Sequence, residues 1–211
     1  MGIVHKQLFS FFAATSAKNI DFFNNQNLAN IAWSFAVANV DAPTLFNDHF
    51  INMCVQKKDG FNTENSTQLY QWHLWHTKEK SHDGLPEELL ISCYKAFISD
   101  DTTISKFQND VVAHLTSIGL DPKEEVLLES GYSIDAIVEV NGKTVGVEVD
   151  GPSHFVGRNK SLTGSTILKR RQVPSIDGVE LVSVPYWEWD KLGKDEIKKQ
   201  EYLRKLLGLR S

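Results

Sequence analysis

Two carboxylates and a histidine stand at the end of an apolar stretch, GVEVDGPSHF, at residues 146–155. Because side chains alternate along a β-strand, Glu148 and Asp150 fall on one face and the neighbouring valines on the other. A Gly-Pro pair then ends the strand, and His154 follows. A surface strand with one solvated face has this pattern, and so does a metal or phosphate site at a strand end.

A third acid comes from the preceding strand. The dipeptide Asn141-Gly142 predicts a two-residue type I′ turn, because both central residues of that turn need a positive φ. Asp135 lies six residues before this turn and Glu148 six residues after it, so the two carboxylates should face each other across the hairpin. Opposed carboxylates repel unless a cation or a raised pKa relieves them. The pair therefore predicts a partner charge, either a divalent metal or the basic segment that follows.

That basic segment reads RNKSLTGSTILKRR, from Arg158 to Arg171, with five basic residues and no acid. The whole chain carries a formal net charge of −5, which argues against indiscriminate nucleic-acid binding. The distribution of charge is more informative than its total, because this is a local basic patch on an acidic protein.

The elements that would position these residues fall into two parts. Residues 1–98 are predicted to be helical, with helices such as QNLANIAWSFAVANV and NSTQLYQWHLWHTKE separated by about forty residues, a spacing typical of helical repeats. The second part, 103–207, is predicted to run helix, strand, hairpin, helix, strand, helix, which indicates a mixed sheet with helices on its faces. Its last strand, VELVSVPYWEW, would place Trp187 and Trp189 on one face and Tyr186 on the other.

The composition adds a few limits. No apolar run is long enough to span a membrane. The first ten residues, MGIVHKQLFS, resemble neither a secretory signal nor an organellar transit peptide. Cys54 and Cys93 lie in apolar helical surroundings and are expected to be buried thiols. His73 and His76 have the spacing of metal ligands, but the sequence offers no third ligand, and we interpret them as incidental.

Three stretches together, YSIDAIVEVNGKTVGVEVDGPSHF, TGSTILKRRQV and VPYWEW, resemble the RAP domain over residues 103–207. The upstream helices look like the repeats of octotricopeptide-repeat-like and FAST kinase-domain proteins. Proteins of these families act on RNA processing, stability and translation in mitochondria or chloroplasts. The RAP domain is similar in fold to PD-(D/E)XK nucleases, so the resemblance implies a restriction-endonuclease-like α/β fold preceded by an all-α helical-repeat segment.

The resemblance also implies roles for individual residues. Asp135 and Glu148 match the two acids of the nuclease pattern, but Asp150 stands where the pattern has a lysine. His154 is the counterpart of the histidine of the very-short-patch repair branch, and Lys169 is a candidate replacement for the missing lysine. Gln108 stands where related nucleases carry a supporting glutamate. Asp135, Glu148 and Asp150 would hold Mg²⁺ as oxygen ligands.

Three functions remain open from the sequence. The first is binding of single-stranded RNA in a mitochondrion or chloroplast, through a set of basic and aromatic side chains: Arg158, Lys160, Lys169, Arg170, Arg171 and Tyr186. The second is a Mg²⁺-dependent endoribonuclease that uses Asp135, Glu148, Asp150, His154 and Lys169. The third is a non-catalytic protein-interaction scaffold, in which the acids pair with Lys and Arg inside the domain.

Overall fold

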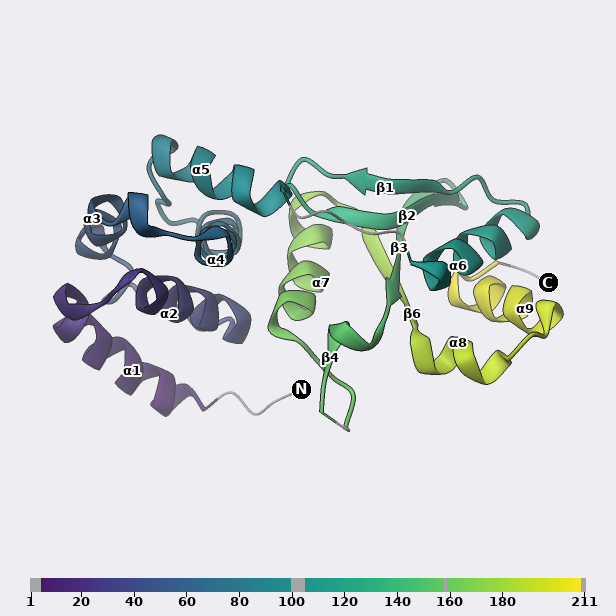
Figure 1. Ribbon diagram of the computed structural model, residues 1–211, viewed down its shortest axis with the longest axis horizontal. Helices are drawn as coiled ribbons and strands as arrows, with labels where there is room; N and C mark the ends of the chain where they lie inside the picture. Colours follow the sequence, from purple (N-terminus) through teal and green to yellow (C-terminus); the bar gives the residue numbers. More distant parts are fainter. Residues whose placement is uncertain (1–4, 100–104, 158, 210–211) are drawn as a thin grey trace. The chain divides into compact units, whose positions relative to one another are not determined.

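A computed structural model describes residues 5–99, 105–157 and 159–209 of the chain (Figure 1). The chain divides into two compact units, Met1–Asp100 and Asp101–Ser211. The described part of the first unit is helical, and the second unit is built on a four-stranded sheet. The prediction of a mixed sheet with flanking helices, preceded by a helical segment, is confirmed.

The first unit consists of α-helices joined by short loops and single helical turns. These elements are α1 (Lys6–Asn19), η1 (Ile20–Phe22), α2 (Asn25–Ala38), α3 (Asp48–Gln56), η2 (Lys58–Gly60), α4 (Thr63–Leu74), the π-helical turn η3 (Trp75–Glu79) and α5 (Glu87–Ile98). An asparagine side chain caps the first turn of each of three helices: Asn24 caps α2, Asn47 caps α3 and Asn62 caps α4. Such caps satisfy backbone N–H groups that have no partner within the helix, so they fix where the helices begin.

Large apolar side chains fill the interior of this unit. Phe35, Phe50, Trp72 and Trp75 are almost completely buried, and Trp72 stacks on His76 with the ring centres 4.6 Å apart. Burial lowers the pKa of the His76 imidazole to about 4, so this ring stays neutral near pH 7. Trp72 and Trp75 therefore serve the packing of this unit.

The second unit begins with helix α6 (Lys106–Ser117) and three strands, β1 (Lys123–Leu127), β2 (Ser133–Val140) and β3 (Lys143–Asp150). After β3 come the turn η4 (Pro152–His154), the short strands β4 (Phe155–Val156) and β5 (Ser161–Leu162), α7 (Gly164–Ile176), β6 (Glu180–Pro185), α8 (Tyr186–Leu192) and α9 (Glu196–Leu206). The main sheet has the order β1-β2-β3-β6. The pair β3–β6 is parallel and the other pairs are antiparallel, so α7 forms the crossover between β3 and β6.

The β2–β3 hairpin has the predicted two-residue turn. Asn141 and Gly142 have φ values of 52° and 76°, and the flanking Val140 and Lys143 are paired. The register continues from this pair to Ala136 opposite Val147. This alignment confirms the hairpin geometry that the Asn-Gly dipeptide predicts.

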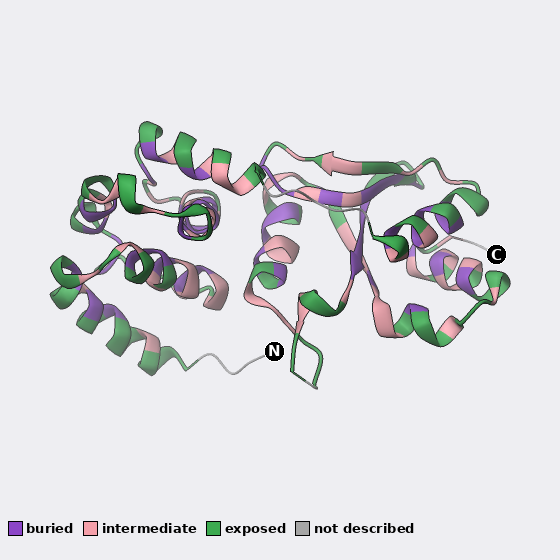
Figure 2. Cartoon of the chain, in the orientation of Figure 1, coloured by how far each residue is buried: buried purple, intermediate pink, exposed green. Residues whose placement is uncertain are grey.

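The two faces of β3 meet different helices. Val145, Val147 and Val149 are buried in an apolar core with residues of α6 and α9. Glu148 and Asp150 point to the opposite face, where their partners come from α7. Figure 1 shows α7 on one side of the sheet and α6 and α9 on the other, and Figure 2 shows burial along β3. Alternation along one strand thus separates the apolar core from the charged cluster.

The prediction that VELVSVPYWEW forms one strand is wrong for the second half of this stretch. Strand β6 ends at Pro185, and Tyr186 to Leu192 form helix α8. A proline has no backbone N–H to continue the ladder, and its φ is suited to the start of a helix. Trp187 and Trp189 therefore do not share a strand face: Trp189 is buried in the core, and Trp187 is half-buried.

Candidate functional site

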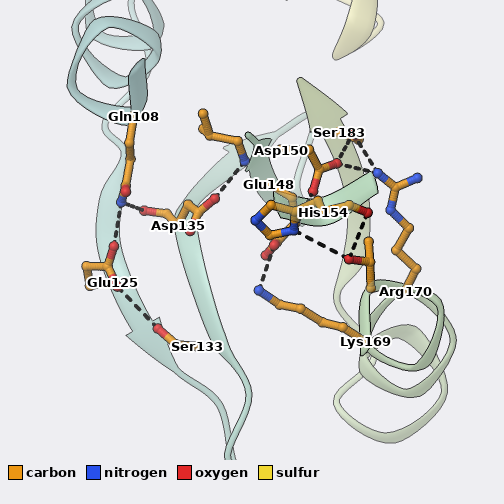
Figure 3. Close-up of polar contacts among 12 residues, drawn as sticks. Gln108, Glu125, Ser133, Asp135, Glu148, Asp150, His154, Lys169, Arg170 and Ser183 are labelled. Atoms are coloured by element: carbon orange, nitrogen blue, oxygen red, sulfur yellow. Dashed lines mark hydrogen bonds and ion pairs between the residues drawn. The ribbon is translucent and has the colours of Figure 1, made fainter. Parts of the chain in front are cut away.

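The candidate site lies on the α7 side of the sheet, where β2 and β3 bring acids together (Figure 3). The β2–β3 register ends at Ala136 opposite Val147, and Asp135 and Glu148 are the next residues along the two strands. Asp150 follows on the same face of β3, and α7 supplies Lys169 and Arg170. The structure thus brings together the three predicted acids and two of the predicted cations.

The side chain of Asp135 is held by a backbone N–H group of β3. One of its carboxylate oxygens, Oδ2, accepts a hydrogen bond of 2.6 Å from the backbone N–H of Val149. Burial raises the pKa of Asp135, while the Val149 hydrogen bond and the charge of Lys169 oppose the rise. The carboxylate is therefore fixed in position at the edge of the cluster.

Glu148 is the most confined of the acids. Only 3% of its surface is exposed, and the Nζ atom of Lys169 donates to its Oε2 over 2.6 Å. Its other oxygen, Oε1, is buried without a hydrogen-bond partner. Burial raises the pKa of Glu148 to about 7, against the opposing charge of Lys169 and with a further rise from Asp135. Glu148 can therefore exchange a proton near neutral pH.

Asp150 is 1% exposed and has polar partners at both of its oxygens. The Nη2 atom of Arg170 and the hydroxyl of Ser183 both donate to Oδ2, and Arg170 also donates to Ser183 over 2.7 Å. His154 Nδ1 lies 3.2 Å from Oδ1. This carboxylate joins the end of β3 to α7 and β6.

A fourth acid, Glu125, was missed from the sequence. Gln108 of α6, which stands where a glutamate was expected, donates from its side chain to Glu125 Oε1 and, over 3.3 Å, to the backbone carbonyl of Asp135. Glu125 has a left-handed φ of 49°, a conformation that costs a glutamate on the order of 1 kcal/mol. Strand β1 thus supplies a carboxylate beside the glutamine. Its charge contributes to the raised pKa of Asp135.

The Mg²⁺ site on Asp135, Glu148 and Asp150 stays a prediction. Asp150 already has Arg170, Ser183 and His154 as partners. Within the described residues, no group of three His, Cys, Asp or Glu side chains is arranged to hold a metal ion. The unpartnered Oε1 of Glu148 is free to accept one metal–oxygen bond.

The predicted RNA-contacting residues separate into two groups. Lys169 and Arg170 are in ion pairs with the cluster, and Arg171 follows them half-buried on α7. Lys160 is exposed and lies over the ring of Trp187, and Tyr186 starts α8 next to that ring. Arg158 lies outside the described residues. The basic segment is therefore not one continuous array of free cations.

This fold and site define a class of protein: an α/β domain whose buried acids face a basic crossover helix, linked to a helical unit. The sequence model of the RAP domain family matches residues 147–206, from within β3 to the end of α9. The chain thus contains a RAP domain, as its motifs predict. Over 201 residues it is 30% identical to a RAP domain-containing protein, chloroplastic, from Oryza sativa subsp. japonica.

That similarity covers 88% of this chain and 30% of the rice protein, so the chain spans under a third of the length of this relative. The matched region therefore includes part of the helical unit as well as the α/β unit. In the part of the chain that the structure describes, no helix combines the length and the apolar character that crossing a membrane requires.

Proposed function

We propose that this protein binds RNA in an organelle and acts there in RNA processing, stability or translation. The observation that carries the proposal is the RAP domain at residues 147–206. The rice relative is named chloroplastic, which favours the chloroplast over the mitochondrion. Single-stranded RNA is the proposed partner, because half-buried aromatic rings beside an exposed lysine suit unpaired bases better than a duplex.

The ion pairs change which residues are proposed to touch RNA. Lys169 pairs with Glu148 and Arg170 pairs with Asp150, so these ion pairs within the domain largely neutralise the two basic side chains. We therefore assign them to holding α7 on the sheet. The surface around exposed Lys160 is the better candidate for contact with phosphate.

Anisotropy titrations with fluorescein-labelled single-stranded RNA, over a range of KCl concentrations, test RNA binding. Affinity should fall with salt, with a log–log slope of about −0.7 for each phosphate neutralised. Single-stranded DNA of the same sequence and an RNA duplex serve as controls. A chain that binds none of these RNAs at low salt contradicts the proposal, and leaves the protein-interaction scaffold as the remaining function.

A second candidate is an endoribonuclease at the same site. The observation that favours it is the contact between Lys169 and Glu148, whose charge Asp135 also influences, because an acid pair with a lysine is the set that this nuclease pattern needs. Here the lysine comes from α7 and not from the strand. His154 beside Asp150 is the proposed general acid or base.

Mg²⁺ is the proposed cofactor of this second candidate, with Asp135 and Glu148 as its protein ligands. Incubation of labelled RNA with Mg²⁺ or with EDTA tests it. Mg²⁺-dependent products that disappear with Glu148→Gln, while RNA binding remains, support an enzyme. Products that form equally in Glu148→Gln come from a contaminant, and an intact RNA pool removes the candidate.

A further inference from the structure

Three aromatic rings meet outside the carboxylate cluster, where the β4–β5 hairpin contacts α8. The ring of Phe155 lies 4.4 Å from that of Trp187 and 6.2 Å from that of Tyr186, and Tyr186 and Trp187 are 5.2 Å apart. All three side chains are half-buried, unlike Trp189 on the same helix, which is in the core. The group is thus accessible from solvent.

A lysine covers this aromatic group. The Nζ atom of Lys160 lies 4.1 Å from the centre of the Trp187 ring, a cation–π contact. Lys160 has a φ of 56°, a left-handed conformation that glycine or asparagine adopts at lower cost. The backbone conformation alone therefore does not favour a lysine in this turn. The place of its side chain over the Trp187 ring indicates a functional role.

The charge around the hairpin suits a polyanion. Residues 151–176, which include β4, β5 and all of α7, contain no aspartate or glutamate. Lys160 is exposed, and so are the other described residues of the hairpin turn (Figure 2). The face of the Trp187 ring can stack on a base, and the exposed Lys160 beside it can pair with the phosphate next to that base.

We propose that Trp187, flanked by Phe155 and Tyr186, is a stacking site for one unpaired nucleobase of RNA, and that Lys160 pairs with the phosphate next to that base. The base takes the place over the indole ring that Lys160 Nζ occupies in the free protein. This inference rests on the proposed RNA binding and deepens it, because it names the part of the RNA that is recognised.

The test uses the whole chain and a labelled ten-nucleotide oligouridylate. Trp187→Ala should weaken binding by about 5- to 150-fold, the range of one base–aromatic stack, whereas Trp187→Phe keeps a ring and should lose less. On an abasic ribose-phosphate oligomer of the same length, the variants and the wild type should bind alike. Lys160→Gln should reduce the salt slope by roughly 0.7, while Lys143→Gln, an exposed lysine at the β2–β3 turn, leaves it unchanged.

Two further measurements separate a loss of stacking from a loss of folding. Circular dichroism shows whether Trp187→Ala folds. If it does not, the oligouridylate-induced quenching of tryptophan fluorescence is compared between wild type and Trp187→Phe, and the quenching should drop in the variant. Undiminished quenching, or equal affinity of folded Trp187→Ala, overturns the stacking site but leaves RNA binding intact. A wild type that binds no RNA overturns both, even if a protein partner is found on this surface.

Discussion

The Nζ atom of Lys169 lies 2.6 Å from Oε2 of Glu148, and the glutamate side chain is only 4% exposed. The two residues come from α7 and β3, so their contact joins the crossover helix to the sheet. A buried ion pair of this kind contributes little net stability, but the loss of one partner leaves a buried charge without compensation. Protonation of Glu148 therefore removes the partner charge of Lys169 in this contact.

The first prediction concerns pH. The pKa of Glu148 is about 7 in the folded chain and 4.5 in its ordinary state, so the folded protein holds this proton more tightly than the unfolded chain. The contribution of Glu148 to the free energy of unfolding should therefore be fully present below about pH 4.5, and fall by up to about 3 kcal/mol as pH rises through 7. Urea unfolding at several pH values between 4.5 and 8 measures it.

Glu148→Gln should remove this pH dependence, because glutamine does not titrate. Glu201→Gln changes an exposed glutamate of α9 and should leave the wild-type dependence unchanged. If the curves of Glu148→Gln and wild type run parallel across this range, then Glu148 is not the titrating group.

The second prediction concerns the end of β3. Arg170→Ala removes the cation that contacts both Asp150 and Ser183, and it should lower the free energy of unfolding by about 3 kcal/mol at pH 7. Ser183→Ala removes one hydrogen bond to the same carboxylate and should cost about 1–3 kcal/mol. Lys205→Ala, at an exposed position of α9, is the control and should change stability by less than about 0.5 kcal/mol. Wild-type stability of Arg170→Ala would show that Asp150 is adequately solvated without it.

The local parts of this site could be predicted from the sequence. Asn141-Gly142 fixes the turn, the turn fixes the register, and the register brings Asp135 and Glu148 to the same end of the hairpin. Each step depends on neighbouring residues only. The predicted cation beside these acids also follows from repulsion between carboxylates, and Lys169 fills that place.

The remaining parts depend on contacts between distant segments. Ser183 reaches Asp150 because β6 pairs in parallel with β3, and no local pattern sets that register. Glu125 faces Gln108 through a strained backbone that a strand pattern does not reveal. The aromatic run after Pro185 favours a strand by propensity, but burial of Trp189 in the core stabilises a helix there.

The third prediction concerns the two thiols of the helical unit. Cys54 and Cys93 are free and completely buried, and burial raises the pKa of Cys93 to about 12 and that of Cys54 further. Because the thiolate is the reactive form, both should resist Ellman's reagent in the native protein and react promptly in urea. A native reaction at least about 100-fold slower than that of the unfolded chain is expected. Prompt native reaction would mean that this unit opens readily.

The last prediction concerns a second buried charge, on the α6–α9 side of the sheet. Lys199 is 7% exposed, and its Nζ atom donates to Asp110 Oδ2 over 2.7 Å. Trp189 Nε1 donates to the same oxygen over 2.7 Å. Burial would raise the pKa of Asp110, but the hydrogen bonds from Lys199 and Trp189 lower it below its ordinary value.

Asp110→Ala should therefore leave a buried ammonium and indole N–H without their acceptor, at a cost of about 2–3 kcal/mol at pH 7. Since the folded pKa of Asp110 is depressed, its contribution is present above the ordinary pKa of aspartate and is lost as pH falls through the folded value. The gap between wild type and variant should then narrow in acid. Asp190→Ala changes an exposed aspartate of α8 and should show no such gap. Urea unfolding of the three proteins at pH 7 and at pH 3 measures it, and a gap equally large at both would assign the loss to packing, not to the charge of Asp110.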